Sequence, residues 1–241
     1  MTNTQKTTII TGASQGIGAA LVEAFLKRGY SVVANSQNIT KAKPFPASAN
    51  LALVDGDIGD PKTAAKIVDT AVSRFGRIDV LVNNAGIFIP KPFTDYTTED
   101  FNALVSTTLA GFLYVSQLSV KQMLRQKSGS IVNVSTTLVD HPVAGVSVSV
   151  QVMAKGSLNA VTRALAMEYA KDGIRVNTVA PSVIKTPMHK PETYEFLKGL
   201  QPLGRMGEIK EVVDAVLFLT DATFTTGEIL HVDGGAHAGK W

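Results

Sequence analysis

The 241-residue sequence contains no cysteine, which excludes disulfide bonds, thiolate catalysis and any metal site built on cysteine ligands. Charge of either sign is also sparse, because only 18% of the residues are charged and the formal net charge is +3. Nucleic-acid-binding proteins typically carry clusters of basic residues interleaved with aromatic side chains. In this sequence the basic residues are scattered and form no such cluster. We therefore expect neither a nucleic-acid partner nor a bound metal ion.

Long apolar runs are missing as well. Residues 1–6 are polar and lead directly into a β-branched segment, without the apolar core of a signal peptide. No later run reaches the length that a membrane span needs. The hydrophobic fraction of 45% is typical of a globular protein with a core. We expect a cytoplasmic protein with no membrane partner.

The clearest local pattern covers residues 7–18. A short β-branched run, 7–11, predicts a buried strand, and apolar residues from Ile17 onward recur at helical spacing. Between them, Gly12, Gly16 and Gly18 allow a tight turn, close approach of a phosphate and close packing of the helix on the strand. The start of a helix also offers unpaired N–H groups and the positive end of its dipole. This stretch predicts a site for a dinucleotide pyrophosphate.

Strand-like and helix-like segments alternate along the rest of the chain. The predicted strands are 7–11, 31–35, 51–54, 78–82, 130–135, 174–179 and 229–232, and the predicted helices are 16–28, 61–75, 98–126, 152–171 and 209–219. Segment 39–50 holds two prolines and reads as a loop, and segment 185–204 is predicted to be a mobile substrate cover. The alternation predicts a single α/β domain over residues 1–241, with a Rossmann-like, doubly wound, parallel seven-stranded sheet flanked by helices on both faces.

Several further motifs occur in a fixed order along nearly the whole chain. They are Thr11-Gly-x3-Gly-Ile-Gly18, Asp57-Ile58, Asn83-Asn-Ala-Gly86, Ile131-Val-Asn-Val-Ser135, Lys155-Gly-Ser-Leu-Asn-Ala-Val, Arg175-Val-Asn-x-Val-Ala-Pro181 and Thr226-Gly-Glu-Ile-Leu-His-Val-Asp-Gly-Gly235. With these motifs the chain resembles the short-chain dehydrogenase/reductase family. The resemblance implies the Rossmann-like fold and a nicotinamide dinucleotide cofactor.

The resemblance also implies a role for each matching position. The backbone of the glycine loop would face the pyrophosphate, the Asp57 pair would hold the adenine edge, and the segment after the fourth strand would line the ribose. Lys155 would bind the nicotinamide ribose, and the residues after the sixth strand would position the carboxamide. The implied cofactor residues are Gly12, Ser14, Gln15, Gly16, Ile17, Gly18, Asp57, Ile58, Asn84, Ala85, Gly86, Lys155, Pro181, Ile184 and Thr186. Two alternatives stay open: Asp57 as a helix N-cap, and Asn84 as a strand-end turn residue.

The choice between NAD and NADP depends on the end of the second strand. An acidic residue there would bind both ribose hydroxyls and repel a 2′-phosphate. This sequence instead has Ser36, Gln37 and Asn38, whose side chains could hydrogen-bond a phosphate, although no basic residue is present. We predict NADP as the preferred cofactor, with NAD as the alternative.

The catalytic positions of the family are where this sequence departs from it. The family uses an Asn, a Ser and a Tyr-x3-Lys pair, whose spacing places the last two on one helix face. Here only Lys155 is kept: Gln151 stands at the tyrosine position and Thr108 at the asparagine position. Counting from the strand places Thr136 at the serine position, counting back from Gln151 gives Leu138, and we choose Thr136 or Thr137.

An amide can donate a hydrogen bond but cannot supply a proton, so Gln151 cannot act as the general acid. His141, in the loop after the fifth strand, is a candidate proton donor because histidine titrates at about pH 6.5. The other histidines, at positions 189, 231 and 237, are assigned to the cover, the last strand and the tail. A second Tyr-x3-Lys, Tyr194 to Lys198, lies in the cover and reads as a coincidental match.

Three functions remain open. The first is an oxidoreductase that acts on a carbonyl, alcohol or imine by an altered proton route, with a small-molecule substrate. The second is a silent dinucleotide-binding sensor or partner subunit, and the third is non-redox chemistry in the same pocket. The resemblance also implies a homotetramer, in which helices 98–126 and 152–171 pair between subunits. In this sequence both helices carry more apolar residues than one stripe needs: Phe112, Leu113, Val115, Leu118, Leu158, Val161 and Leu165.

Overall fold

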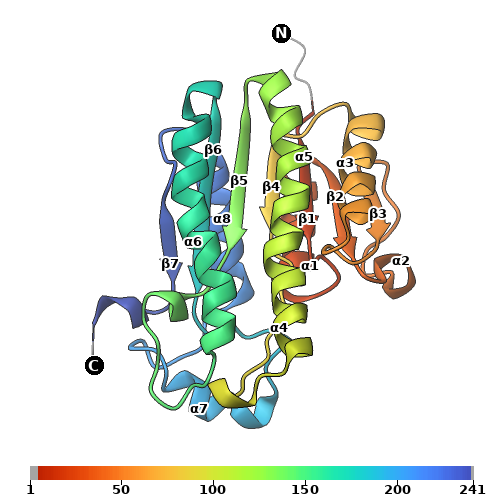
Figure 1. Cartoon of the computed structure of the whole chain (residues 1–241). Coiled ribbons are helices and arrows are strands. Elements are labelled where there is room, and N and C mark those ends of the chain that lie inside the picture. Colours follow the sequence, from red (N-terminus) through yellow and green to blue (C-terminus); the bar gives the residue numbers. More distant parts are fainter. Residues whose placement is uncertain (1–4, 240–241) are drawn as a thin grey trace.

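One parallel sheet runs through the middle of the molecule. In the computed structural model, which describes residues 5–239, seven strands follow the order β3-β2-β1-β4-β5-β6-β7. Their bounds are β1 Thr7–Thr11, β2 Ser31–Ser36, β3 Leu51–Asp55, β4 Val80–Asn83, β5 Gly129–Val134, β6 Ile174–Pro181 and β7 Ile229–Val232. The order reverses between β1 and β4, so a crevice forms beyond the carboxyl ends of these two strands, at the lower edge of Figure 1.

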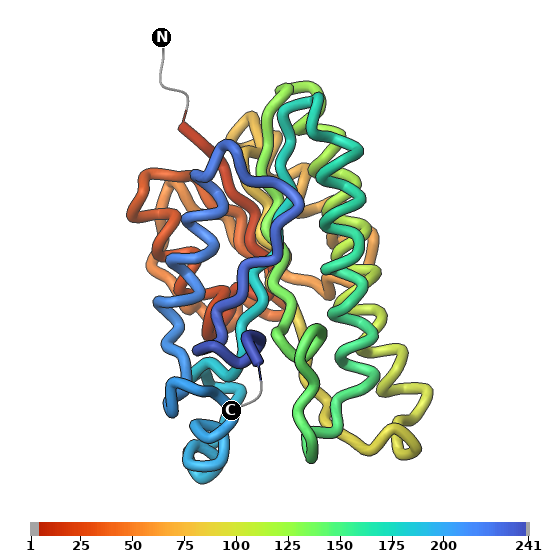
Figure 2. Tube along the Cα trace, turned by 90° about the vertical axis from the view of Figure 1, so that its left-hand side faces the viewer, coloured from red at the N-terminus to blue at the C-terminus, as the bar shows by residue number. Residues whose placement is uncertain are grey.

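Helices cover both faces of the sheet, as Figure 2 shows from the side. Helices α1 (Gly16–Lys27) and α8 (Ile209–Asp221) pack on one face, and α3 (Pro61–Phe75), α5 (Gly111–Gln126) and α6 (Ser149–Tyr169) pack on the other. Strand β1 supplies both cores, because Ile10 points toward α1 and α8 while Ile9 points toward α3 and α5. The predicted fold class is therefore confirmed.

A chain of buried polar side chains fixes α6 against the sheet. Asn83 of β4 donates to Asn133 Oδ1 of β5 at 2.9 Å, and Asn133 in turn donates to Thr162 Oγ1 of α6 at 2.9 Å. The Thr162 hydroxyl also lies 2.7 Å from the Thr178 hydroxyl of β6. Because a buried polar group without a partner is costly, these hydrogen bonds favour the observed register of α6. That register sets where Gln151 and Lys155 lie.

Some predicted bounds differ from the structure. A short helix, α2 (Ile39–Ala42), stands in the predicted loop 39–50, because Asp55 accepts from both the amide and the hydroxyl of Thr40. The predicted helix 98–126 is divided into α4 (Thr98–Val105), a π-helical turn (Ser106–Ala110) and α5. Segment 185–204 contains a short helix, α7 (Tyr194–Lys198), which lies beyond the strand ends in Figure 1.

The stretch Thr98–Gln126 is long and apolar enough to cross a membrane by length and composition alone, contrary to the expectation from sequence. In this fold, however, α5 packs on α3, β4 and β5, and its Val115 is completely buried. Leu158 of α6 is likewise buried, so these two of the apolar residues counted beyond one stripe pack inside the chain. Leu113, by contrast, is 44% exposed and stays available for a contact outside the chain.

Candidate active site

A cavity of about 1360 Å³ lies beyond the carboxyl ends of the strands. Its volume exceeds the roughly 300–1,000 Å³ of a typical small-ligand pocket, so an extended ligand and a second molecule fit together. The wall brings together most of the residues predicted from sequence: Gly12, Ser14, Gln15, Gly16, Ile17, Gly18, Ser36, Gln37, Asp57, Ile58, Asn84, Ala85, Gly86, Thr136, Thr137, Leu138, His141, Gln151, Lys155, Pro181, Ile184 and Thr186. Asn38 and Thr108 do not line it.

The glycine loop between β1 and α1 forms one end of the cavity. Gly12 has a φ of +66°, and a Cβ added there would lie 2.7 Å from Ala85 Cα. A Cβ at Gly18 would lie 2.2 Å from the Gly12 carbonyl oxygen, so no larger residue fits without moving the backbone. Gln15 is the N-cap residue of α1, but its side chain makes no capping hydrogen bond, and the first turn of the helix holds no acidic residue. These features fit a dinucleotide pyrophosphate, which needs a close approach and unpaired N–H groups.

The segment after β4 is tied to this loop by its polar groups. Asn84 Nδ2 donates to the carbonyl oxygens of Thr11 (3.0 Å) and Gly12 (3.1 Å). In return, Thr11 Oγ1 accepts from the amides of Asn84 and Ala85. Asn84 therefore joins two strand ends across the crevice, which is more than the turn-forming role that stayed open from sequence.

Asp57, two residues after β3, is not the N-cap of the following helix. The cap of α3 is Asp60, whose side chain accepts from the Lys62 amide at 2.9 Å. Asp57 instead accepts from the Gly59 amide at 2.9 Å and lines the cavity. The N-cap interpretation of Asp57 is thus wrong, and its assignment to the adenine edge stays a prediction.

The end of β2 carries hydroxyl and amide groups and no carboxylate. Ser36 and Gln37 line the cavity, and Ser36 Oγ lies 3.1 Å from Ser14 Oγ of the glycine loop. Asn35 turns its side-chain amide away, toward the carbonyl oxygens of Val54 and Gly56. Asn38 lies beyond the wall, directly before α2.

Gln151 and Lys155 lie one turn apart on α6, and both line the cavity. Their exposed fractions are only 4% and 7%. Lys155 Nζ donates to the Val134 carbonyl oxygen at 2.6 Å, and burial lowers the pKa of Lys155 from 10.5 to about 8. Gln151 Oε1 is buried, and no hydrogen-bond donor for it exists among residues 5–239. This face of α6 thus combines an amide with an ammonium group that releases its proton more readily than usual.

The loop after β5 presents two threonine side chains to the cavity. The Thr137 hydroxyl is buried and donates to Asp233 Oδ2 at 2.7 Å. The Thr136 hydroxyl accepts from the Leu138 amide at 3.3 Å, so its own hydrogen is free to point elsewhere. Of the two candidates, Thr136 is therefore the better donor toward a ligand.

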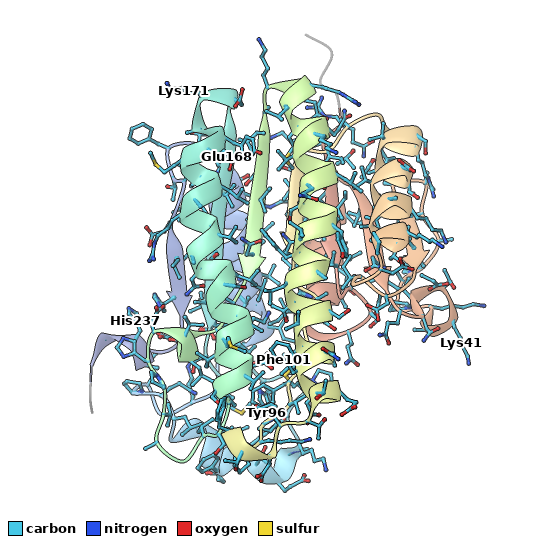
Figure 3. The ribbon with its side chains drawn as sticks, viewed as in Figure 1. Lys41, Tyr96, Phe101, Glu168, Lys171 and His237 are labelled. Carbon is cyan, nitrogen blue, oxygen red and sulfur yellow. The ribbon has the colours of Figure 1, made fainter. Side chains whose placement is uncertain are left out.

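Asp233 belongs to a polar cluster that the sequence reasoning missed. Asp233 Oδ2 also lies 2.8 Å from His237 Nδ1, and the His237 ring stacks on His231 with a centroid distance of 4.0 Å. His231 Nε2 in turn lies 3.1 Å from Asp140 Oδ2, beside His141. Figure 3 shows His237 at the left-hand edge of the molecule. The Asp-Gly-Gly motif after β7 can be recognised in the sequence, but no sequence pattern predicts its hydrogen bond with Thr137.

Thr108, which is predicted to stand at the family's asparagine position, does not line the cavity. The structure places it in the π-helical turn, where it is buried and its Oγ1 has no partner within the described chain. The neighbouring Thr107 lines the cavity instead. A π-helical turn holds more residues than an α-helical turn, so it shifts which side chain faces the ligand. The count from Gly111 could not reveal that shift.

Segment 185–204, the predicted substrate cover, contributes apolar side chains and a histidine to the wall. Phe196, Leu197 and Leu200 line the cavity, as does His189, whose pKa is lowered by burial. Tyr194 and Lys198 do not line it, and Lys198 pairs with Glu195 at 2.5 Å. The second Tyr-x3-Lys therefore forms no part of the described wall. Among residues 5–239, no group of three His, Asp or Glu side chains is arranged to hold a metal ion.

Residues 12–237 match the family described as Enoyl-(Acyl carrier protein) reductase. A tropinone reductase homolog of Arabidopsis thaliana is 37% identical, over 95% of this chain and 92% of its own length. The chain belongs to the short-chain dehydrogenase/reductase family. Two solved structures share the fold of this dehydrogenase/reductase with a TM-score of 0.90: ElxO with NADP bound, and the 3-ketoacyl-(acyl-carrier-protein) reductase of Brucella melitensis complexed with NADH. They are 30% and 29% identical, covering 98% and 96% of this chain and 100% and 98% of their own.

Proposed function

We propose that this family member binds NAD(P) along the cavity and reduces a carbonyl or imine, or oxidises an alcohol in reverse, with an altered proton-donor arrangement. The observation that carries the proposal is the continuous wall that joins the glycine loop to Gln151 and Lys155. The dinucleotide supplies or accepts the hydride when it is bound. Known relatives that are reductases and dehydrogenases support the same reaction class.

In this proposal the side chains at the substrate end orient the reacting group. Thr136 donates its free hydroxyl hydrogen to the substrate oxygen or nitrogen, and Gln151 Nε2 can donate a second hydrogen bond. The glycine loop and Lys155 hold the dinucleotide. His141 lines the cavity, so a histidine or a bound water is available as a proton source from the solvent side.

NADP is proposed as the preferred cofactor. The end of β2 presents Ser36 and Gln37 without any carboxylate that would repel a 2′-phosphate. Comparison of the dissociation constants for NADP(H) and NAD(H), by titration calorimetry, tests this choice. Tighter binding of NAD(H) would reverse it.

The decisive experiment combines binding with turnover. Purified protein is titrated with both dinucleotides and then assayed with the tighter one against a panel of ketones, aldehydes and cyclic imines. We expect micromolar binding and turnover of at least one substrate class. Binding without turnover of any class would contradict the oxidoreductase proposal.

A silent dinucleotide-binding sensor or partner subunit is the second candidate. It is favoured by one observation: Gln151 and Thr108, at two of the family's catalytic positions, carry no group that ionises. Such a protein would bind the dinucleotide and leave every panel member unchanged, so the same experiment separates the two candidates.

We also propose a homotetramer with a small-molecule substrate. Leu113 of α5 and Met153 and Met167 of α6 are exposed apolar side chains on the helices through which family members pair. Light scattering at micromolar concentration should give four times the mass of one chain. A monomer under those conditions would count against the assembly.

A further inference from the structure

The missing tyrosine leaves one ionisable side chain on the buried face of α6 that borders the cavity. Gln151 and Lys155 are four residues apart and therefore lie on the same side of the helix. The Gln151 amide has no proton to give, whereas a lysine ammonium carries three. A proton that leaves this face of α6 must therefore come from Lys155.

The surroundings of Lys155 leave part of its ammonium group available. One of its hydrogens goes to the Val134 carbonyl oxygen at 2.6 Å, and no second hydrogen bond of Nζ exists within residues 5–239. Gly86, on the opposite wall, has no side chain, and a Cβ there would lie only 3.2 Å from Nζ. The glycine thus keeps the space beside Nζ open toward the cavity.

No charged group holds the proton on Lys155. The other ionisable side chains of the cavity wall are Asp57, His141, His189 and Lys190, and none bonds to Nζ in the described chain. On neighbouring elements, the carboxylates of Asp100, Asp140 and Asp233 are engaged with Lys91, His231 and His237 respectively. Burial alone lowers the pKa of Lys155 to about 8, which is close to a physiological operating pH.

From this geometry we propose that Lys155 itself is the general acid of carbonyl reduction in this chain, in addition to holding the cofactor ribose. The inference rests on the proposed function. As hydride adds to the carbonyl carbon, the C=O π pair moves to oxygen, and that oxygen takes a proton from Nζ directly or through one water. An O–H bond forms, an N–H bond breaks, and the neutral amine regains a proton from solvent.

The test uses two substrates of similar shape, of which only one needs a proton during reduction. A cyclic ketone requires one, whereas the matching N-methylated cyclic iminium ion becomes a neutral amine by hydride addition alone. Lys155→Arg keeps a positive charge and hydrogen-bond donors but cannot release a proton in this pH range. The exposed Lys66→Arg on α3 is the matched control.

We expect Lys155→Arg to lower kcat for the ketone about 100-fold, within the usual range of general acid catalysis, and to change iminium reduction less than about threefold. Equal loss of both activities, with a weakened dinucleotide Kd, would show that Lys155 only holds the cofactor and would overturn the inference. Iminium reduction without any ketone reduction in the parent protein would also overturn it, while the proposed function would stand. Failure of both substrates would refute the proposed function and this inference together.

A second readout, by NMR, needs neither substrate nor cofactor, and a third is the pH dependence of turnover. Lysine labelled with ¹³C at Cε gives an NMR resonance for Lys155, identified by its loss in Lys155→Arg. We expect it to titrate near pH 8, and ketone reduction by the parent should fall as pH rises through that value because the ammonium loses its proton. Alcohol oxidation, which needs the neutral amine, should rise over the same interval. Titration near pH 10.5 would overturn the inference.

Discussion

The two ends of the cavity are built from different parts of the chain. At the glycine-loop end, backbone groups and tight contacts define the site, and a Cβ at Gly12 or Gly18 would collide with backbone atoms. At the α6 end, side chains define it, and Gln151, Thr136 and Thr108 stand where the family resemblance implies a tyrosine, a serine and an asparagine. A site made of backbone tolerates few substitutions, whereas a site made of side chains changes its chemistry with one. The binding end is therefore constrained by backbone packing, while the chemistry of the reacting end depends on individual side chains.

The largest effect should come from Gly18→Ala at the binding end. The added Cβ would lie 2.2 Å from the Gly12 carbonyl oxygen, and relieving such overpacking costs up to about 3 kcal/mol. We expect the dinucleotide Kd to rise about 100-fold, measured by calorimetry. Gly199→Ala is the control, because its nearest atom would be 3.4 Å away. Unchanged binding in Gly18→Ala would show that the loop is not where the dinucleotide binds.

At the reacting end, Gln151→Tyr should give the next largest effect. A phenol one turn from Lys155 restores the family's proton donor, and we expect kcat for ketones to rise about 10- to 100-fold. The full gain of general acid catalysis is not expected, because Lys155 already supplies the proton. Gln151→Phe has the same bulk without a hydroxyl and should give no gain. Equal kcat values for Gln151→Tyr and Gln151→Phe would show that the gain comes from the bulk of the ring and not from its hydroxyl.

The structure brings the predicted glycine-loop and strand-end residues together along one cavity, because their positions follow from local patterns. The order of β1, Gly12 and α1 requires only neighbours in sequence. The reacting end depends on contacts between distant residues, such as Thr137 with Asp233, which no local pattern encodes. Thr108 does not line the cavity for a related reason: the π-helical turn before Gly111 changes the facing residue without any composition that marks it.

Removing the hydroxyl at position 137 should lower the stability of the fold and leave dinucleotide binding unchanged. Thr137→Val leaves Asp233 with one donor fewer, and a hydrogen bond to a charged group contributes about 2 kcal/mol. We expect the free energy of unfolding in urea at pH 7 to fall by that amount, and Thr137→Ser to recover most of it. An unchanged dinucleotide Kd in Thr137→Val should accompany the loss. A loss equal in the Ser variant would exclude the hydroxyl as the cause.

The same contact has a pH dependence. Burial raises the pKa of Asp233, but hydrogen bonds from Thr137 and His237 lower it more, so the net value lies below the ordinary 3.8. A carboxylate whose folded pKa is lowered stabilises the fold above its unfolded pKa, and this contribution disappears as pH falls through the folded pKa. Urea unfolding between pH 7 and pH 2 should show a smaller decline in Thr137→Val than in the parent. An identical decline would mean that Thr137 does not affect this carboxyl group.

The smallest effect concerns the choice of dinucleotide. Gln37 lines the cavity and Asn38 does not, so Gln37→Arg should favour NADP over NAD about three- to fivefold more than the parent does. An exposed charge is screened by solvent, which keeps the change small. Asn38→Arg is the matched control and should shift the ratio of the two Kd values less. A larger shift from Asn38→Arg would move the 2′-phosphate site toward α2.

The tie between Thr137 and Asp233 spans 96 residues of chain. At a synthesis rate of about 5–20 residues per second, Asp233 is made roughly 5 to 20 seconds after Thr137. During that interval the loop after β5 has no carboxylate to fix it, although the glycine loop and its neighbours in β1 and β4 are already complete. The glycine loop is therefore synthesised well before the carboxylate that fixes the loop after β5.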